Sequence, residues 1–244
     1  MTFYVNMGRA VDLTAALQRR LRLYRQDNQP VIKKSIVEKL GLSGYLRALF
    51  TNPKVGASYP LVLQRIVHEG HELGLHGGRN HGAWQASGLD WPVSRLKDEV
   101  VWGVQEMRKA GLPRPESFAS PGWVSPLGLP LLLRELGFTV LADMHDPECS
   151  AYTGVDTPVQ ALNTNLLGEP GGVGWFESMD ARGIGDNEAL SMALKHIDEH
   201  STAILYDHPC YMVRKIGFAR QFIKELKSNG VCFLTAQHLS KGGN

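Results

Sequence analysis

The sequence of 244 residues has only three cysteines, Cys149, Cys210 and Cys232, and they are widely spaced. It contains no Cys-x-x-Cys pair, and an odd number of cysteines does not make a disulfide framework. This usage is typical of a reducing compartment, so we expect a cytoplasmic protein. Cys210 follows His208 closely, which raises a cysteine nucleophile as an alternative. The proline between them argues against it, because proline tends to end the strand that would align the two side chains.

Long apolar runs and a large excess of one charge are also lacking. No run approaches the ~18 apolar residues of a membrane-spanning helix, and the first ten residues do not have the pattern of a secretory signal. Any membrane contact should therefore be peripheral. The 26 basic and 24 acidic residues give a formal net charge of +2, which argues against nucleic acid as a partner. The basic stretch 19–25 is more typical of a solvated helix face.

Short apolar runs alternate with segments of helical periodicity, which is typical of an α/β fold. Strands are predicted at Thr2–Val5, Glu72–His76, 117–120, 138–142, 203–206 and 231–234. Helices are predicted at 13–25, 31–50, 59–69, 94–110, 129–136, 187–199 and 217–228. The segment 145–174 has no regular pattern, and nothing resembles a linker, so we expect a single domain over residues 1–244.

Two local patterns sharpen these predictions. The helix at 59–69 is amphipathic, with its core contacts expected at Leu61, Leu63, Ile66 and Val67. Ser94 has the side chain of a helix cap and is expected to begin the helix at 94–110.

Polar residues follow the predicted strands at the points where they end. In folds of alternating strands and helices, functional residues gather at the carboxyl ends of the parallel strands. These ends carry Asn6, His76, Ser120, Asp143 and His208. We therefore expect these side chains to line one cleft.

Four of the nine histidines lie between residues 68 and 81. His71 precedes a predicted strand that His76 ends, so the two cannot share a small site. His76 and His81 are separated by Gly-Gly-Arg-Asn, a loop that can fold back and direct both imidazoles at one ion. Two imidazoles suit a divalent transition metal such as zinc, usually with a third imidazole or carboxylate ligand. The alternative is that these are ordinary loop and cap histidines.

His208 follows the apolar run Ala-Ile-Leu-Tyr-Asp and immediately precedes a proline. A histidine at this position can be a general acid, a base, a metal ligand or a buried residue with satisfied hydrogen bonds. Asp207 should point to the opposite face of a regular strand, so we do not expect a simple Asp–His dyad. The glycine-rich segment 168–174 lacks the lysine and hydroxyl residue of a phosphate-binding loop and is better interpreted as a flexible loop over the site.

The runs TFYVNMGR, HELGLHGGRNHGAWQ, SPGW, AILYDHP and GVCFLTA resemble, in this order, the polysaccharide deacetylase (NodB-type) family. They are most similar to the branch that deformylates formamido-arabinose carried on a polyprenyl phosphate. The resemblance covers nearly the whole chain. It implies an irregular, incompletely closed (β/α) barrel and the metal-dependent removal of an N-acyl group from an amino sugar, which in that branch is lipid-linked.

The resemblance also implies roles for individual residues. His76 matches the first metal histidine of the family. His81 matches the second if the loop has one inserted residue, whereas Asn80 would match without it, and imidazole is the better zinc ligand. His208 matches the general acid that protonates the departing amine. We expect Asn6, Ser120 and Trp123 to contact the substrate, although the arginine that family members often carry in the segment 119–123 has no counterpart.

One departure from the family concerns its two aspartates, a metal ligand and the general base, which lie on a strand preceding the one that matches Thr2–Val5. No Asp-x-Asp occurs in this sequence. We therefore expect an impaired hydrolase or, alternatively, a non-catalytic sugar-binding protein of the same fold. Asp143 and Asp146, beyond a predicted strand end, are candidates to replace the base. Without a preceding strand, Thr2–Val5 would have an unpaired edge, from which we expect self-association and marginal stability.

Overall fold

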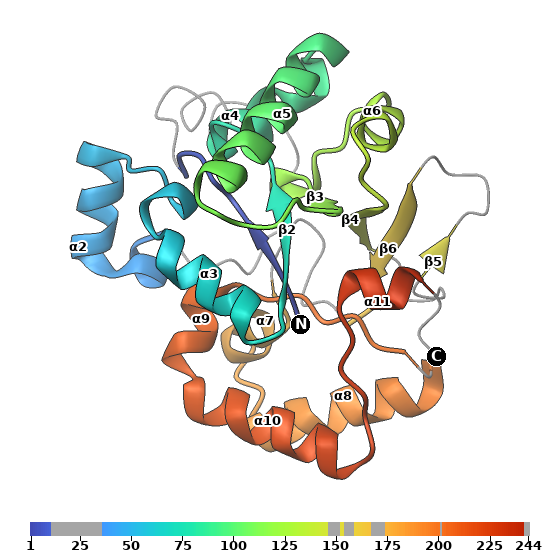
Figure 1. Ribbon diagram of the computed structural model, residues 1–244. Coiled ribbons are helices and arrows are strands. Elements are labelled where there is room, and N and C mark those ends of the chain that lie inside the picture. Colours follow the sequence, from blue (N-terminus) through green and yellow to red (C-terminus); the bar gives the residue numbers. More distant parts are fainter. Residues whose placement is uncertain (11–35, 146–151, 154–158, 167–173, 201, 242–244) are drawn as a thin grey trace.

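A central sheet with helices around it forms the architecture of the computed structural model (Figure 1). The structure describes residues 1–10, 36–145, 152–153, 159–166, 174–200 and 202–241. The strands are β1 (Thr2–Val5), β2 (Glu72–His76), β3 (Ser117–Ala119), β4 (Val140–His145), β5 (Tyr152–Thr153) and β6 (Gln160–Thr164). Their order is β1-β2-β3-β4-β6-β5, in which the first five run parallel and β5 pairs antiparallel with β6.

The helices lie on the outside of this sheet. They are α2 (Ile36–Thr51), α3 (Pro60–His68), α4 (His81–Ser87), α5 (Val93–Lys109), α6 (Leu129–Glu135), α7 (Trp175–Ala181), α8 (Asp186–His200), α9 (Pro209–Arg214), α10 (Ile216–Ser228) and α11 (Ala236–Ser240). Helices α4, α5 and α6 lie at the top of Figure 1, and α8, α9 and α10 form a layer at the bottom. The described strands do not close on themselves, and the fold is an α/β fold of the incompletely closed barrel type.

The parallel register brings the carboxyl ends of the first strands to one edge of the sheet. Val5 pairs with Leu75, and His76 pairs with Ala119. The residues that follow these strands are therefore neighbours across the sheet, as the strand pattern predicts.

The largest apolar cluster lies between the sheet and helices α3 to α6. Leu96, Val100 and Met107 are fully or almost fully buried on one face of α5. Helix α3 buries Leu63, but Leu61 is 77% exposed, so its predicted core contact is wrong. Residues two apart on a helix point to nearly opposite faces, so Leu61 faces solvent where Leu63 faces the core.

A second apolar cluster joins helices α7 to α10. The ring of Phe176 lies 5.0 Å from the rings of both Phe218 and Phe222, in edge-to-face geometry. Such pairs add to the stability that burial of the rings provides. This cluster fixes α7 and α9, which flank His208, against the long helices α8 and α10.

The strand predicted at 203–206 is wrong. The segment makes one β-bridge, between Leu166 and Leu205. The side chain of Asn165 accepts the N–H of Ile204 at 2.7 Å and donates to the carbonyl two residues earlier at 2.8 Å. A side-chain amide thus takes the place of the backbone ladder. The strand predicted at 231–234 is also wrong, because these residues form an extended connection to α11.

Several boundaries differ from the prediction. Helix α5 begins at Val93 with Pro92 as its N-cap, so Ser94 is not the cap. The strand predicted at 138–142 is β4, Val140–His145. Helices α4, α7, α9 and α11 and strand β6 were not predicted. The helix predicted at 13–25 lies outside the described residues, as does the first part of the one predicted at 31–50.

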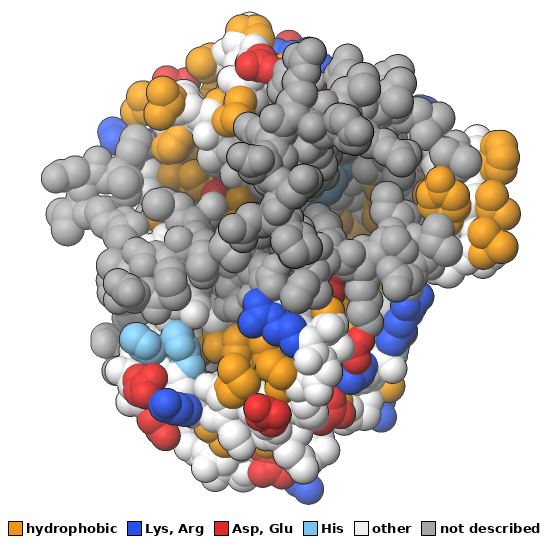
Figure 2. Space-filling view, turned by 180° about the vertical axis from the view of Figure 1, so that it is seen from behind, with side chains coloured by type: hydrophobic (Ala, Val, Ile, Leu, Met, Phe, Trp, Pro, Cys, Tyr) orange, Lys and Arg blue, Asp and Glu red, His pale blue; other side chains and the backbone are white. Residues whose placement is uncertain are grey.

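Strand β1 lies at one edge of the described sheet and pairs with β2. Self-association through this edge stays a prediction. Of the helices in the described ranges, none is long and apolar enough to cross a bilayer. Figure 2 shows the face opposite to that of Figure 1, where basic and acidic side chains are interspersed, consistent with the small net charge.

Glu72 joins four elements at the amino-terminal end of the sheet. Its carboxylate accepts hydrogen bonds from the hydroxyls of Thr2 (2.9 Å) and Ser117 (2.5 Å) and from the N–H of Gln237 (3.0 Å). These bonds connect β1, β2, β3 and α11. Hydrogen bonds to a charged group each contribute about 1.5–3 kcal/mol.

We expect Glu72→Ala to lower the free energy of unfolding by about 2–4 kcal/mol, which is less than the sum of the three bonds because these part-buried donors can bind water once the carboxylate is gone. Urea unfolding measures this change. Glu69→Ala is the matched control, since Glu69 pairs with Arg65 on the surface and exposed pairs of this kind contribute little to stability. An equally small loss for both variants would contradict a structural role of Glu72.

Candidate active site

His76 and His81 face each other across a four-residue loop. His76 is the last residue of β2 and His81 is the first residue of α4. Their Nε2 atoms are 3.1 Å apart. Asn80 is the N-cap of α4, where its side-chain oxygen accepts the N–H of Ala83 at 3.1 Å. The Asn80 side chain therefore caps the helix, and it is the imidazole of His81 that lies against that of His76.

The hydrogen bonding of His76 leaves its Nε2 as the acceptor. Its Nδ1 lies 2.8 Å from the carbonyl of Ala119, so Nδ1 carries the proton. Burial lowers the pKa of His76 to about 4, although the bond to Ala119 opposes this shift and the nearby His208 adds to it. His76 is therefore neutral near pH 7, as a metal-ligating imidazole must be.

This pair of imidazoles fits two positions of a divalent transition-metal site. Two nitrogens that are each about 2.0–2.1 Å from one tetrahedral zinc ion lie about 3.3–3.4 Å apart. The observed separation of 3.1 Å is slightly shorter than this, and it is also the length of a direct N–H···N bond. Among the residues that the structure describes, no third His, Cys, Asp or Glu completes a set of three.

Asp143 is buried within β4, two residues before the strand ends, and anchors the loop that follows β3. One of its oxygens accepts the N–H of Ser120, and the other accepts the hydroxyl of Ser125. Burial raises the pKa of Asp143, while the hydrogen bonds from both serines oppose this shift. Its geometry is that of a structural anchor and not of a base directed at His76. The other candidate base, Asp146, lies outside the described residues.

The anchored loop carries Trp123 in an unusual backbone conformation. Gly122 and Trp123 both have positive φ, at 64° and 57°. A bulky residue in the left-handed region costs about 1–3 kcal/mol and is found most often at functional sites. The indole lies 5.6 Å from the ring of Tyr206, which brings it next to His208.

His208 is the N-cap of α9, and a polar group lies near each of its ring nitrogens. Its Nδ1 is 3.3 Å from Oε2 of Glu177, and its Nε2 is 2.9 Å from the hydroxyl of Tyr206. Glu177 is only 1% exposed, so its carboxylate faces the imidazole in a water-poor environment. Burial raises the pKa of Tyr206, so the tyrosine keeps its proton and can donate it to Nε2. His208 also contributes to the lowered pKa of His76, so these two imidazoles lie within electrostatic range of each other.

The sequence interpretation missed both partners of His208. Glu177 lies on α7 within Trp-Phe-Glu-Ser-Met, an apolar run in which a glutamate is conspicuous because lone charged residues are rarely buried without a role. Tyr206 is two residues before His208. That spacing places them on the same side of an extended segment, and it was the signal available in the sequence.

The other predicted site residues have structural roles in the described part of the chain. Asn6 shapes the turn after β1, since its side chain accepts the N–H of Gly8 at 2.8 Å and donates to the carbonyl of Arg9 at 3.2 Å. The Ser120 hydroxyl is 3.1 Å from that of Ser125. His71 lies at the other end of β2, as predicted. Its ring is near that of Phe3. The glycine-rich segment 168–174 lies outside the described residues except for its last residue.

Asp207 supports the backbone around His208. Its carboxylate accepts the N–H of Phe176 and of His208, both at 2.7 Å, so the acidic partner of the imidazole is Glu177 and not Asp207. Burial raises the pKa of Asp207 from 3.8 to about 6, against the effect of these two hydrogen bonds.

We expect this carboxyl to make stability depend on pH. Because its folded-state pKa lies above the unfolded value, its contribution is full below pH 4 and is lost as the pH rises through 6, by up to about 3 kcal/mol. Asp207→Asn should remove this dependence. Urea unfolding of the wild type and the variant at pH 4.5 and 7 measures this dependence. The lowered pKa of His76 makes stability rise with pH, but it does so equally in both proteins, so the difference between their pH profiles isolates Asp207. Parallel pH profiles for the two proteins would contradict the expectation.

Solved structures with the same fold place this site in context. No protein-family profile and no curated protein sequence matches the chain. A putative polysaccharide deacetylase from Mycobacterium smegmatis superposes with a TM-score of 0.61 and 17% identity, over 76% of this chain and 67% of that one. The chain has the polysaccharide deacetylase fold. The Puue allantoinase superposes with a TM-score of 0.53 and 16% identity, over 77% of this chain and 64% of that one.

Proposed function

We propose that this protein is a metal-dependent hydrolase that removes an N-acyl group from an amino sugar. A fold hosts many activities, so the proposal depends on the site itself. Its main support is the pair of Nε2 atoms 3.1 Å apart on His76 and His81, together with His208, which lies beside a buried carboxylate and within electrostatic range of His76. Neither a structural role nor sugar binding alone requires this combination.

In this proposal His76 and His81 hold a divalent metal such as zinc. A bound metal of this kind polarises a carbonyl and lowers the pKa of its water ligand. The Ala119 carbonyl fixes the His76 ring in the tautomer that presents Nε2.

His208 is the general acid that protonates the departing amine. In the doubly protonated ring, Nδ1–H points toward the Glu177 carboxylate and Nε2–H toward the oxygen of the Tyr206 hydroxyl. The Nε2 proton passes to the departing amine when the amine replaces this hydroxyl as its acceptor. Tyr206 holds Nε2 in its present orientation.

The substrate class is an N-formyl or N-acetyl amino sugar, free or carried on a lipid. Trp123 and Tyr206 provide adjacent aromatic surfaces next to His208, and such surfaces suit the apolar face of a sugar ring. These two partly buried aromatic side chains are the part of the site that would distinguish a sugar amide from a peptide amide.

Turnover should be slow. No carboxylate in the described ranges joins His76 and His81, so the group that removes the water's proton is weak or absent there. The same observation favours a second candidate, a sugar-binding protein of this fold without catalytic activity.

An assay of released acid and free amine separates the two candidates. The protein, with zinc and then with a chelator, is incubated with N-formyl and N-acetyl amino sugars. Slow release of formate or acetate that stops with chelator supports the hydrolase. Saturable sugar binding without release, measured by calorimetry, identifies the binding protein and overturns the proposal.

A further inference from the structure

The loop between His76 and His81 must reverse direction within four residues, 77–80. Gly77 has a φ of +74°, a conformation that favours glycine. At Gly78, a Cβ atom would lie 2.6 Å from the Cβ and 3.0 Å from the Cα of Glu99. The loop therefore lies directly against helix α5, closer than any residue with a side chain would permit.

Glu99 binds this loop from α5. Its Oε2 accepts the N–H of Arg79 at 2.6 Å, and its Oε1 lies 3.3 Å from the Arg79 guanidinium. The same guanidinium donates to the carbonyl of Asp98 at 3.2 Å. Glu99 is 9% exposed, and a hydrogen bond from a backbone N–H to a buried carboxylate is stronger than one between neutral groups.

The opposite side of the loop is held by the segment after β1. The N–H of Arg9 donates to the carbonyl of Arg79, and the N–H of His81 donates to the carbonyl of Arg9, both at 2.8 Å. Gly8 lies so close to the Arg79 carbonyl that a Cβ would overlap it. The loop thus lies between the backbone of residues 8–9 on one side and helix α5 on the other, where the Glu99 carboxylate accepts the hydrogen bond from the loop.

We propose that Glu99 is the positioning residue that holds the 77–80 loop and thereby sets the distance between the imidazoles of His76 and His81. The inference rests on the proposed metal site. His76 is fixed by its strand and by Ala119, so the position of His81 depends on the loop. Groups that support metal ligands from behind typically change metal affinity by about 10–100-fold when they are removed.

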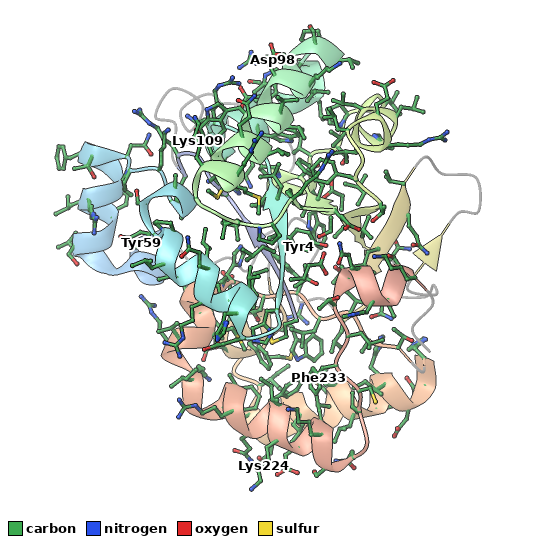
Figure 3. All side chains as sticks on the ribbon, in the orientation of Figure 1. Tyr4, Tyr59, Asp98, Lys109, Lys224 and Phe233 are labelled. Atoms are coloured by element: carbon green, nitrogen blue, oxygen red, sulfur yellow. The ribbon has the colours of Figure 1, made fainter. Side chains whose placement is uncertain are left out.

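Helix α5 also provides a matched control. Glu106 lies two turns further along the same helix, is 8% exposed, and binds the ammonium groups of Lys54 (3.1 Å) and Lys109 (2.6 Å). Figure 3 labels Asp98, next to Glu99, and Lys109 near the two ends of this helix. The two glutamates share burial and charge but differ in whether they contact the loop.

The first measurement is zinc affinity by competition with a chromophoric chelator. We expect Glu99→Ala to weaken binding by about 10–100-fold and Glu106→Ala by less than about 3-fold. Glu99→Gln, which keeps an acceptor for the Arg79 N–H but loses the charge, should lie between wild type and Glu99→Ala. Equal effects of Glu99→Ala and Glu106→Ala would overturn the proposal, since they would reflect general loosening of α5.

The second measurement does not require metal. Amide hydrogen exchange of the segment 77–82 should accelerate at least about 10-fold in Glu99→Ala and not in Glu106→Ala, because the Arg79 N–H loses its acceptor. If wild type binds no zinc, the proposed function fails, and exchange still decides the role of Glu99 in holding the loop. Unchanged exchange in Glu99→Ala overturns the inference even where zinc binding is found.

Discussion

His208→Gln should lower the rate constant for N-acyl hydrolysis by about 10²–10⁴-fold with little change in KM, because glutamine cannot deliver a proton to the departing amine. The imidazole is held for this role by Glu177 at Nδ1 and Tyr206 at Nε2. Single-turnover measurements with excess zinc-loaded protein quantify the rate even where turnover is slow.

Two further variants separate proton transfer from structural damage. Glu177→Gln keeps the size of the side chain and removes its charge, so it should lower the rate less than His208→Gln and alter its pH profile. His71→Gln changes a histidine at the opposite end of β2, beside Phe3, and should leave the rate within about 2-fold of wild type. A His208→Gln protein as fast as His71→Gln would exclude His208 as the general acid.

Trp84→Ala should lower the free energy of unfolding by about 3–5 kcal/mol, the usual cost of truncating a buried aromatic residue. Trp84 is fully buried on α4, and its ring lies 5.5 Å from that of Trp91 and 5.7 Å from that of Phe118. Its Nε1–H also donates to the carbonyl of Val124 at 2.9 Å, which ties α4 to the loop that carries Trp123.

Urea unfolding of the wild type, Trp84→Ala and Trp84→Phe tests this role of Trp84. Trp84→Phe keeps most of the packing and loses the hydrogen bond, so we expect a loss of about 1–2 kcal/mol. Zinc affinity should fall with stability in Trp84→Ala, because α4 begins at His81. A loss below about 1 kcal/mol in Trp84→Ala would mean that the site is held by other contacts.

The parallel core of the fold could be predicted because its signals are local. Glu72–His76 is a short run with buried apolar residues and a polar end, and α5 has three buried apolar side chains, Leu96, Val100 and Met107, at helical spacing. Helix α4 was missed because its seven residues include a glycine and begin within what reads as a loop. The propensity of so short a segment is weak, and its helix depends on the Asn80 cap and the burial of Trp84.

The prediction errors in the carboxyl-terminal half of the chain arise from contacts between residues that are far apart in the sequence. The run 203–206 has the composition of a strand, but the Asn165 side chain takes hydrogen bonds that a neighbouring strand would make. That contact joins residues 39 positions apart, and no local pattern indicates it. The same holds for the approach of Glu177 to His208, 31 positions later. His76 could be predicted from its position at the end of a strand, and His81 from the short glycine-rich loop that follows it. The groups that orient the histidines could not be predicted.

Metal analysis of the wild type and two variants tests the central claim most directly. After zinc loading and dialysis, the wild type should retain zinc below one equivalent, since no third ligand joins His76 and His81 within the described residues. His81→Ala and His76→Ala should each retain markedly less. X-ray absorption of the loaded wild type should show imidazole nitrogens at about 2.0–2.1 Å from zinc. Equal and tight zinc binding by the wild type and His76→Ala would contradict a metal site at these two histidines.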